Sequence, residues 1–400
     1  MIARHQLPVF SPIEVASIAR AVGPTIAGSA APLLAVSSAL RARYGAGAVA
    51  LTDSGTSALV MALRLVAGRG GTVAYPGYAC VDLTSAAERA GVKVRLYDLD
   101  PQTLSADLDS LRAVLRRGVD AVVAVHLFGY PADVVAMTEI AIEHGVTVIE
   151  DAAQGAGGTL RRGLLGSLGA LSVLSFGRGK GTTGGNGGAL LSVHSAWNRR
   201  VDYAAAALGR PAAGWGDLAA ATAQWMLGRP SIYGIPASIP ALHLGEMIYH
   251  PAAEPRSLSM AAASLVRRAL RAADEELAVR RRIAERLSVL VARAPAIRPV
   301  RAVEGGNPGY LRFPVVDAQN RPAAPSLGVL RPYPGTLCDQ GPLRPLLHPG
   351  EAAGPGALEL GAHLFTLPTH SLVSATDLDR LERWLLAQST PILASPAGEN

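Results

Sequence analysis

The residue of this sequence best suited to covalent chemistry is Lys180, which lies in its most glycine-rich stretch, Gly-Arg-Gly-Lys-Gly-Thr-Thr-Gly-Gly-Asn-Gly-Gly. Lysine supplies two of the 37 basic residues and arginine supplies all the others. An arginine side chain stays protonated at working pH, whereas a lysine can lose its proton and form an imine with an aldehyde. Lys93, in Ala-Gly-Val-Lys-Val, is typical of a surface residue. We therefore expect Lys180 to be the catalytic amine.

Three further features fit a pyridoxal phosphate site around this amine. Asp151 follows a predicted strand and can pair with the protonated pyridine nitrogen, which keeps the ring electron-withdrawing. Gln154, three residues later, can hydrogen-bond the ring hydroxyl. The run Gly55-Thr56-Ser57 at a helix start can hold the phosphate on free amides and hydroxyls, with Ser175 adding a hydroxyl beside the lysine loop. Each feature alone is more often a cap or a turn, but their combination predicts a cofactor site.

Alternating strand and helix patterns must position these residues. The predicted strands are 48–52, 72–75, 92–97, 119–125, 146–150, 171–176 and 189–193, and the predicted helices are 12–45, 58–67, 81–90, 107–117, 132–144, 258–294 and 375–386. Such alternation with short connections indicates an α/β fold with a mostly parallel sheet, whose ligands bind at the carboxyl ends of the strands. No helix is expected between the strands on either side of the Lys180 loop.

The pattern changes from about residue 200. Residues 200–250 indicate short helices and irregular connections, and their tryptophan, methionine and isoleucine residues favour packing in a core or a dimer interface over contact with a hydrophobic substrate or a membrane surface. We expect a large domain over 1–250, a smaller C-terminal α+β domain over 251–390, and a loose tail over 391–400.

The motifs resemble those of the DegT/StrS-like aminotransferases, pyridoxal phosphate enzymes of the aspartate-aminotransferase superfamily, fold type I. The matching segments are 51–59, 75–80, 126–133, 149–154, 175–180, 187–189 and 367–370. The most specific is Ile-Glu-Asp-Ala-Ala-Gln at 149–154, followed by Ser-Phe-x-x-x-Lys at 175–180. The contacts predicted for the cofactor are Gly55, Thr56, Ser57, Tyr78, Cys80, Asp151, Gln154, Ser175 and Lys180.

Three positions depart from the family pattern. Asn186 stands where the family usually has an acidic residue before the glycine pair. Cys80 aligns with a position that often carries an aromatic ring over the cofactor, with Tyr78 nearby as the other candidate. The Gly-x-Asn-x-Arg segment, through which the neighbouring subunit usually reaches phosphate and substrate, is not found.

The resemblance implies a ping-pong aminotransferase that moves an amino group, by imine chemistry at Lys180, from glutamate or glutamine to a keto acceptor. In this family the acceptor is commonly a nucleotide-linked keto sugar, and the enzyme is a homodimer with active sites at its interface. Two alternatives stay open: a dehydratase or eliminase of the same fold, and a non-catalytic regulatory relative. The family's sugar dehydratases have histidine in place of the lysine, which disfavours the first, and the intact Lys180, Asp151 and Gln154 disfavour the second.

Composition excludes several other classes. The net charge of +6 is small for 400 residues, so the arginine clusters near 267–271 and 280–282 indicate a solvated helix face and no nucleic-acid partner is expected. Two cysteines and scattered histidines predict no disulfide framework and no metal site. Without an apparent signal peptide or an apolar stretch long enough to span a membrane, we expect a cytoplasmic protein.

The glycine-rich loop also matches two nucleotide motifs in part. Residues 179–184 satisfy G-x-G-x-x-G, but a strand is expected after them, where the dinucleotide motif needs a helix. A P-loop is excluded because Gly181, and not serine or threonine, follows the lysine.

Overall fold

The computed structural model describes residues 4–239, 247–319, 321–333 and 335–387, and the statements below concern these residues. Its largest sheet has seven strands in the order β1-β9-β8-β5-β4-β2-β3. The strands are β1 Ala48–Thr52, β2 Thr72–Pro76, β3 Lys93–Tyr97, β4 Ala121–Val125, β5 Thr147–Asp151, β8 Leu171–Ser175 and β9 Gly188–Ser192. β8, β5, β4, β2 and β3 pair in parallel, whereas β9 runs antiparallel to both of its neighbours. The prediction of a mostly parallel sheet is confirmed.

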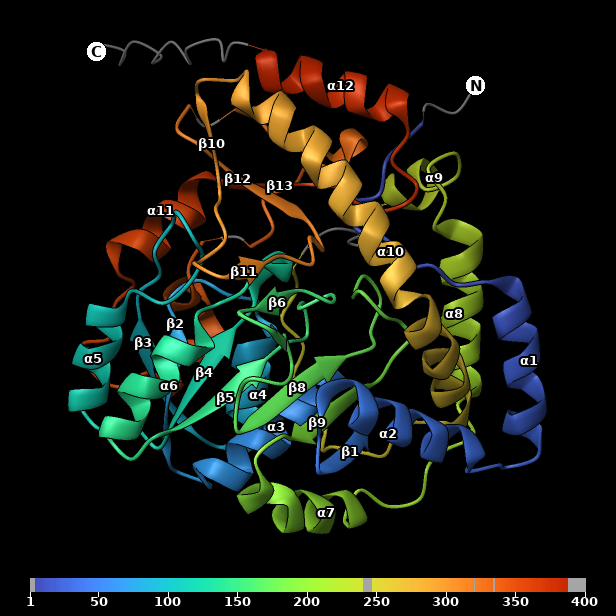
Figure 1. Cartoon of the computed structure of the whole chain (residues 1–400), viewed down its shortest axis with the longest axis vertical. Helices are drawn as coiled ribbons and strands as arrows, with labels where there is room; N and C mark the ends of the chain where they lie inside the picture. Colours follow the sequence, from blue (N-terminus) through green and yellow to red (C-terminus); the bar gives the residue numbers. More distant parts are fainter. Residues whose placement is uncertain (1–3, 240–246, 320, 334, 388–400) are drawn as a thin grey trace, which may run out of the picture.

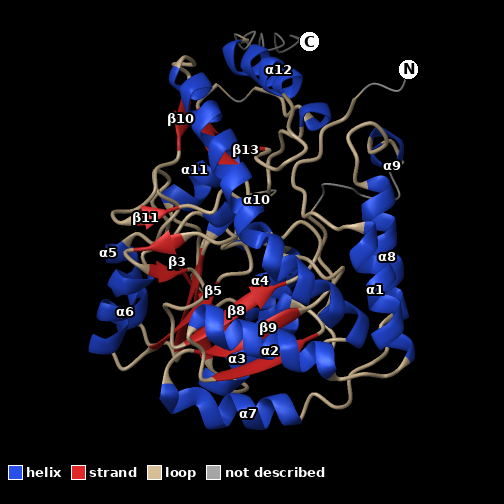
Figure 2. Ribbon diagram, turned by 45° about the vertical axis from the view of Figure 1, so that its right-hand side comes forward, coloured by secondary structure: helices blue, strands red, loops and turns tan. Residues whose placement is uncertain are grey.

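Helices cover this sheet on both faces (Figure 2). They are α2 Ala31–Tyr44, α3 Gly55–Val66, α4 Asp82–Ala90, α5 Leu108–Arg116, α6 Val134–Glu143 and α7 Asn198–Ala206. All residues of β1, β4 and β9 are buried, as expected of strands that are covered from two sides. Aliphatic strand residues with no polar alternation therefore form a continuous core under the functional edge of the sheet.

A second, three-stranded sheet lies above the first one in Figure 1. It pairs β10 Ile297–Pro299 and β13 Leu364–Leu367 with the central β12 Phe313–Asp317, all antiparallel. Helices α11 Pro355–His363 and α12 Ala375–Leu386 accompany it, and a small ribbon of β6 Thr159–Leu160, β7 Gly163–Leu164 and β11 Gly306–Asn307 links it to the large sheet. The predicted helix 375–386 is confirmed.

One long helix, α10 Met260–Ala292, spans both parts of the molecule (Figure 1). Its first turns contribute Ala262 and Val266 to the core around β1 and β9. Its last turns contribute Ile283 and Leu287 to the core under the second sheet. The domain division near residue 250 stays a prediction, and α10 is the element that couples the two cores.

The two regions with irregular sequence patterns are helical in part. Residues 12–45 form two helices, α1 Val15–Ile26 and α2, because residues 27–30 turn the chain between them. Within the described part of 200–250, α8 Trp215–Leu227 and the short α9 Gly234–Ala237 alternate with irregular segments, as predicted. The predicted tail at 391–400 lies outside the described residues. No helix among the residues described is long and apolar enough to cross a membrane.

Candidate active site

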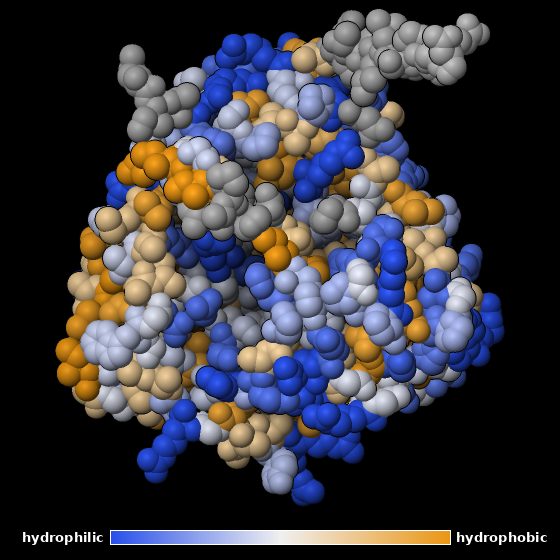
Figure 3. All heavy atoms as spheres, turned by 180° about the vertical axis from the view of Figure 1, so that it is seen from behind, coloured by the Kyte–Doolittle hydropathy of each residue, from blue (hydrophilic) through white to orange (hydrophobic). Residues whose placement is uncertain are grey.

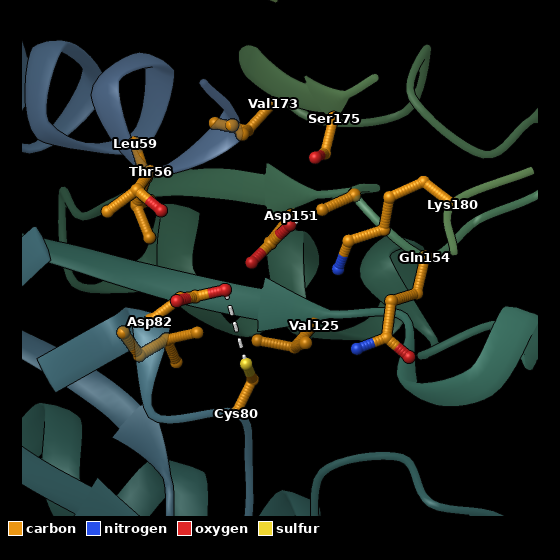
Figure 4. Close-up of a pocket in the computed structure, with 13 residues that line it drawn as sticks. Thr56, Leu59, Cys80, Asp82, Val125, Asp151, Gln154, Val173, Ser175 and Lys180 are labelled. Carbon is orange, nitrogen blue, oxygen red and sulfur yellow. Dashed lines mark hydrogen bonds between the residues drawn. The ribbon is translucent and has the colours of Figure 1, made fainter. Parts of the chain in front are cut away.

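The cavity that contains Lys180 opens at the carboxyl ends of β1, β2, β4, β5 and β8. Its walls are Gly55, Thr56, Leu59, Cys80, Asp82, Leu83, Val125, Asp151, Ala153, Gln154, Val173, Ser175 and Lys180, and they enclose about 470 Å³, open solvent at its mouth included. Figure 4 shows the Lys180 amine, the Asp151 carboxylate and the Gln154 amide directed into this one space. The parallel sheet thus brings together residues that are more than one hundred positions apart in the sequence.

The Lys180 loop is held by its own backbone and by the N-terminal segment. The amide of Gly184 donates to the Phe176 carbonyl (2.9 Å), and the Ser11 hydroxyl donates to the Lys180 carbonyl. Gly179 adopts a φ of 76°, and a Cβ on it would lie 2.8 Å from a Val9 methyl, so glycine is required there. The loop between antiparallel β8 and β9 directs the amine into the cavity.

Asp151 is a buried carboxylate, and few contacts compensate its negative charge. Its Oδ1 accepts one hydrogen bond, from the Ala153 amide at 3.0 Å, and no arginine or lysine of the described residues forms an ion pair with it. Burial raises the pKa of Asp151, while the Ala153 hydrogen bond and the nearby Lys180 charge oppose this shift. A cationic ring nitrogen is the kind of partner that this carboxylate lacks.

Gln154 is oriented by groups on both sides of its amide. Its Oε1 accepts from the Phe128 amide (3.1 Å), and its Nε2 donates to the Tyr333 hydroxyl (2.8 Å). Because an amide nitrogen carries two hydrogens, one remains to donate to a ligand oxygen. Tyr333, which comes from the C-terminal part of the chain, could not be assigned to this role from sequence patterns.

The predicted phosphate end is built on the first turn of α3. Ser54 caps this helix, since its hydroxyl accepts from the Ser57 amide at 3.0 Å and lies 2.9 Å from the Ser57 hydroxyl. Gly55 and Thr56 line the cavity, whereas Ser57 is buried and is used for the cap. A Cβ on Gly55 would lie 2.7 Å from the Cβ of Ser175, so only glycine lets the helix start approach that residue.

The structure separates the two candidates for covering the ring. Cys80 lines the cavity, and burial raises the pKa of its thiol, which lies 3.4 Å from the Asp82 carboxylate (Figure 4). Tyr78 is fully buried behind the wall, with its ring 5.2 Å from that of Tyr333, and it does not line the cavity. Asp82 is an acidic wall residue that sequence reasoning missed.

A buried ion network supports the strand end that carries Asp151. The Glu150 carboxylate accepts from Nε2 of His126 (2.8 Å), from three amides between residues 166 and 169, and from the Ser172 hydroxyl (2.7 Å). Nδ1 of His126 accepts from the Ala132 amide at 3.0 Å, so the ring proton lies on Nε2. Burial opposes ionisation of Glu150, but these hydrogen bonds outweigh it and lower its pKa.

Asn186, the departure from an acidic residue, joins the lysine loop to the divergent segment. Its Nδ2 donates to the carboxylate of Asp217 (2.9 Å), which also accepts from the Ser259 hydroxyl at the start of α10. An acid at position 186 would face Asp217 and repel it. Helix α8, in the segment after residue 200, therefore stabilises the Lys180 loop through the hydrogen bond between Asp217 and Asn186.

Together, the mostly parallel sheet and the lysine, aspartate and glutamine at its carboxyl edge have the arrangement that the sequence analysis expected of a pyridoxal phosphate site. Residues 33–215, a segment that makes up less than half of the chain, match the model of the DegT/DnrJ/EryC1/StrS aminotransferase family. The segment contains every residue predicted for the cofactor.

Individual proteins and solved structures are also similar to this chain. The chain is 32% identical over 242 residues to an L-glutamine:2-deoxy-scyllo-inosose aminotransferase of Streptoalloteichus tenebrarius, covering 60% of this chain and 51% of the relative. A crystal structure of 3-amino-5-hydroxybenzoic acid synthase has a TM-score of 0.72 and 18% identity, covering 95% of this chain and 98% of that one. A GDP-4-keto-6-deoxymannose-3-dehydratase has the same TM-score of 0.72 at 15% identity, covering 95% and 100% of the two chains.

These similarities differ in sequence identity and in the share of each protein that they cover. At 18% and 15% identity, the two solved structures are evidence for the fold alone. The chain spans about half or less of the length of the first curated relatives that it matches.

Pyridoxal 5′-phosphate is the expected cofactor, and the residues present fit it. The undercompensated Asp151 suits a protonated pyridine nitrogen, the free Gln154 hydrogen suits a ring hydroxyl, and the close approach of Gly55 to Ser175 forms a cradle for phosphate at a helix start. No group of histidine, cysteine and acidic side chains in the described ranges is arranged to hold a metal ion.

Proposed function

We propose that this protein is a pyridoxal phosphate-dependent aminotransferase that moves an amino group from an amino acid to a keto group on a sugar or cyclic polyol. The convergence of Lys180, Asp151 and Gln154 in one cavity carries the proposal. We infer the acceptor class from relatives that are L-glutamine:2-deoxy-scyllo-inosose aminotransferases. Glutamine, named as their amino donor, and glutamate are the donors we expect.

Each residue has a distinct part in this chemistry. When bound, pyridoxal phosphate supplies an aldehyde that bonds covalently to amines and a ring that withdraws electrons. Nζ of Lys180 holds the cofactor at rest and, once released, accepts the proton from the carbon that bears the donor amine. Asp151 keeps a positive charge on the ring nitrogen, Gln154 fixes the ring oxygen, and Gly55, Thr56 and Ser175 hold the phosphate.

The visible absorption spectrum of the purified protein tests the proposal. We expect a yellow band with pyridoxal phosphate, which L-glutamate or L-glutamine bleaches, and no turnover in a Lys180→Arg variant, because a guanidinium cannot act as the base. A Lys93→Arg variant is the matched control and should behave as wild type. Full turnover by Lys180→Arg would contradict the proposal.

Elimination chemistry is the second candidate, since a dehydratase has the same fold. A lysine at position 180 favours transamination over it. A yellow band that no donor changes, with loss of water from a keto sugar, would favour the dehydratase. The same unresponsive band without such a reaction would favour a regulatory relative.

We propose further that the protein acts as a homodimer in the cytoplasm. Among the described residues no arginine lines the cavity to bind a phosphate dianion, and an arginine of a second copy of the chain would supply that contact. Cys80 and Cys338 are free thiols, which agrees with a reducing compartment.

A further inference from the structure

A second cavity lies between α1, α2 and the first half of α10. Both α1 and α2 pack against α10 (Figure 1), with Ile18 of α1 in one core with Leu265 and Val36 of α2 in another with Val266. The cavity encloses about 570 Å³, open solvent at its mouth included, against about 470 Å³ for the cofactor cavity. The two cavities have no wall residue in common, so this one is a separate site.

The walls of the second cavity are strongly basic. Arg20 comes from α1, and Arg267, Arg268 and Arg271 come from α10. The other described wall residues are serine, alanine and proline, so none of them is acidic. Helices α1 and α2 contain no acidic residue, and α10 contains none before Asp274. The local sequence therefore concentrates positive charge around this cavity.

Three of the four guanidinium groups lack a partner. Among the described residues, no carboxylate lies within ion-pair distance of Arg20, Arg267 or Arg271, and these side chains donate no hydrogen bond. Arg267 and Arg271 are four residues apart on one helix, where like charges repel each other. The arginine cluster that the sequence assigned to a solvated helix face thus borders a cavity in which an anion would relieve this repulsion.

The fourth guanidinium is held in place but is only weakly neutralised. Nε of Arg268 donates to the Ser17 hydroxyl at 2.8 Å, and its Nη2 lies 3.8 Å from the Glu14 carboxylate. The Glu14 side chain is 69% exposed, so solvent screens this pair. Asp274, the first acid of α10, pairs with Arg43 instead. The acidic groups of this region therefore leave most of the positive charge at the cavity uncompensated.

Phosphate is the anion that matches such a group of arginines. The N–H groups of a guanidinium are spaced to bind two phosphate oxygens at once, and the guanidinium keeps its charge at all working pH values. Several guanidinium groups around one cavity suit a ligand that has several oxygens and more than one negative charge. Chloride, with a single charge, and a lone carboxylate, with two oxygens, satisfy fewer of these donors.

We propose that this second cavity binds a phosphate-bearing ligand, with Arg267, Arg268 and Arg271 of α10 and Arg20 of α1 as its cationic contacts. The phosphate belongs either to a small molecule in solution or to a lipid headgroup. The site is independent of Lys180 and of the aminotransferase function, because it shares no residue with the cofactor cavity.

Calorimetric titration with sodium diphosphate tests the site. The protein is kept in low-salt buffer with pyridoxal phosphate, which fills the phosphate place near Gly55. We expect the wild type to bind one diphosphate per chain, and the double variant Arg267→Gln/Arg271→Gln to bind it roughly 10- to 100-fold more weakly. Arg282→Gln/Arg286→Gln, which removes the same charge at the same spacing from exposed positions of α10, is the control and should bind as wild type.

Co-sedimentation with vesicles distinguishes the two sources of phosphate. Binding to phosphatidylcholine vesicles only when they contain phosphatidic acid, lost in Arg267→Gln/Arg271→Gln, would assign the site to a lipid headgroup. Diphosphate binding with the same loss would assign it to a soluble ligand. A wild type that binds neither diphosphate nor these vesicles would overturn the inference, and so would equal losses in the two double variants, because net charge alone then explains the binding. Arg20→Gln, at an exposed position of α1, provides the test if the α10 variant does not fold.

Discussion

At the scale of single residues, the cavity wall contains a carboxylate that is costly to bury. The expected ligand would compensate its negative charge. Asp151 is a buried carboxylate that accepts one hydrogen bond from the described residues. Burying a charge without a partner is unfavourable. Asp151 is therefore better explained by ligand binding than by stability of the empty fold.

Replacing Asp151 by asparagine separates these two effects. The raised pKa means that stability is lost as pH rises, because the unfolded chain ionises this carboxyl more readily than the folded one. We expect cofactor-free Asp151→Asn to be at least as stable as wild type at pH 7 in urea unfolding. Its affinity for pyridoxal phosphate should fall roughly 10- to 100-fold.

Asp82→Asn, on the wall of the same cavity, is the control for that experiment. It should retain wild-type affinity for the cofactor, because Asp82 has no assigned cofactor contact. A cofactor affinity of Asp151→Asn equal to that of wild type would remove Asp151 from the role of ring partner.

At the scale of elements, segments far apart in the sequence are joined by buried side chains. Glu150 joins β5 to the loop before β8, and Asp217 joins α8 to the lysine loop and to α10. His370 follows β13, and its Nε2 donates to the Leu7 carbonyl at 2.9 Å, which attaches the N-terminal segment to the second sheet. These contacts fix the loops that surround the cavity.

His370 predicts an acid-dependent loss of stability. Burial lowers its pKa to about 4 from 6.5, so below pH 6.5 the unfolded chain binds a proton that the folded protein does not. Its contribution to the free energy of unfolding should fall by up to roughly 3 kcal/mol between pH 6.5 and 4. Comparing urea unfolding of His370→Gln and wild type at several pH values measures this slope.

The exposed His144 of α6 provides the control for this comparison. His144→Gln should keep the wild-type dependence on pH, whereas His370→Gln should lose most of the slope in this window. Equal slopes in all three proteins would mean that His370 is not the group that titrates.

At the scale of the whole molecule, the edge formed by α8 and α9 carries exposed apolar side chains. Trp215, Met226 and Ile235 are 53%, 54% and 49% exposed. Figure 3, seen from behind, shows apolar side chains along the side on which α1, α8 and α9 lie in Figure 1. Such a concentration favours an interface over a solvated face.

We expect light scattering to give twice the chain mass of 41.3 kDa, with a shift toward monomer when Met226 and Ile235 are both replaced by glutamate. The reason is that two buried charges per subunit oppose association. Ile142→Glu, a substitution at a 70% exposed position on α6, should stay dimeric. A double variant that remains dimeric would place the interface elsewhere, and binding of the wild type to liposomes would favour membrane contact.

The sequence by itself determined the fold class and most of the cavity. Mostly apolar strands of the large sheet alternate with helices between β1 and β5, and such local patterns depend only on neighbouring residues. Asp151 and Ser175 end β5 and β8, and Gln154 and Lys180 lie in the loops that follow these strands. These four residues were predictable because the parallel strands end at one edge of the sheet.

Only the tertiary structure decided which side chains from distant segments complete the site. Tyr333 and Asp217 carry no local motif. Tyr333 lies 179 residues after Gln154 in the sequence, and only the packed structure brings the two side chains within hydrogen-bond distance. The choice between Cys80 and Tyr78 also depended on packing, because strand direction and the turn after β2 determine which side chain faces the cavity and which is buried behind it. Local patterns do not encode such contacts, which arise only when the two sheets and α10 pack together.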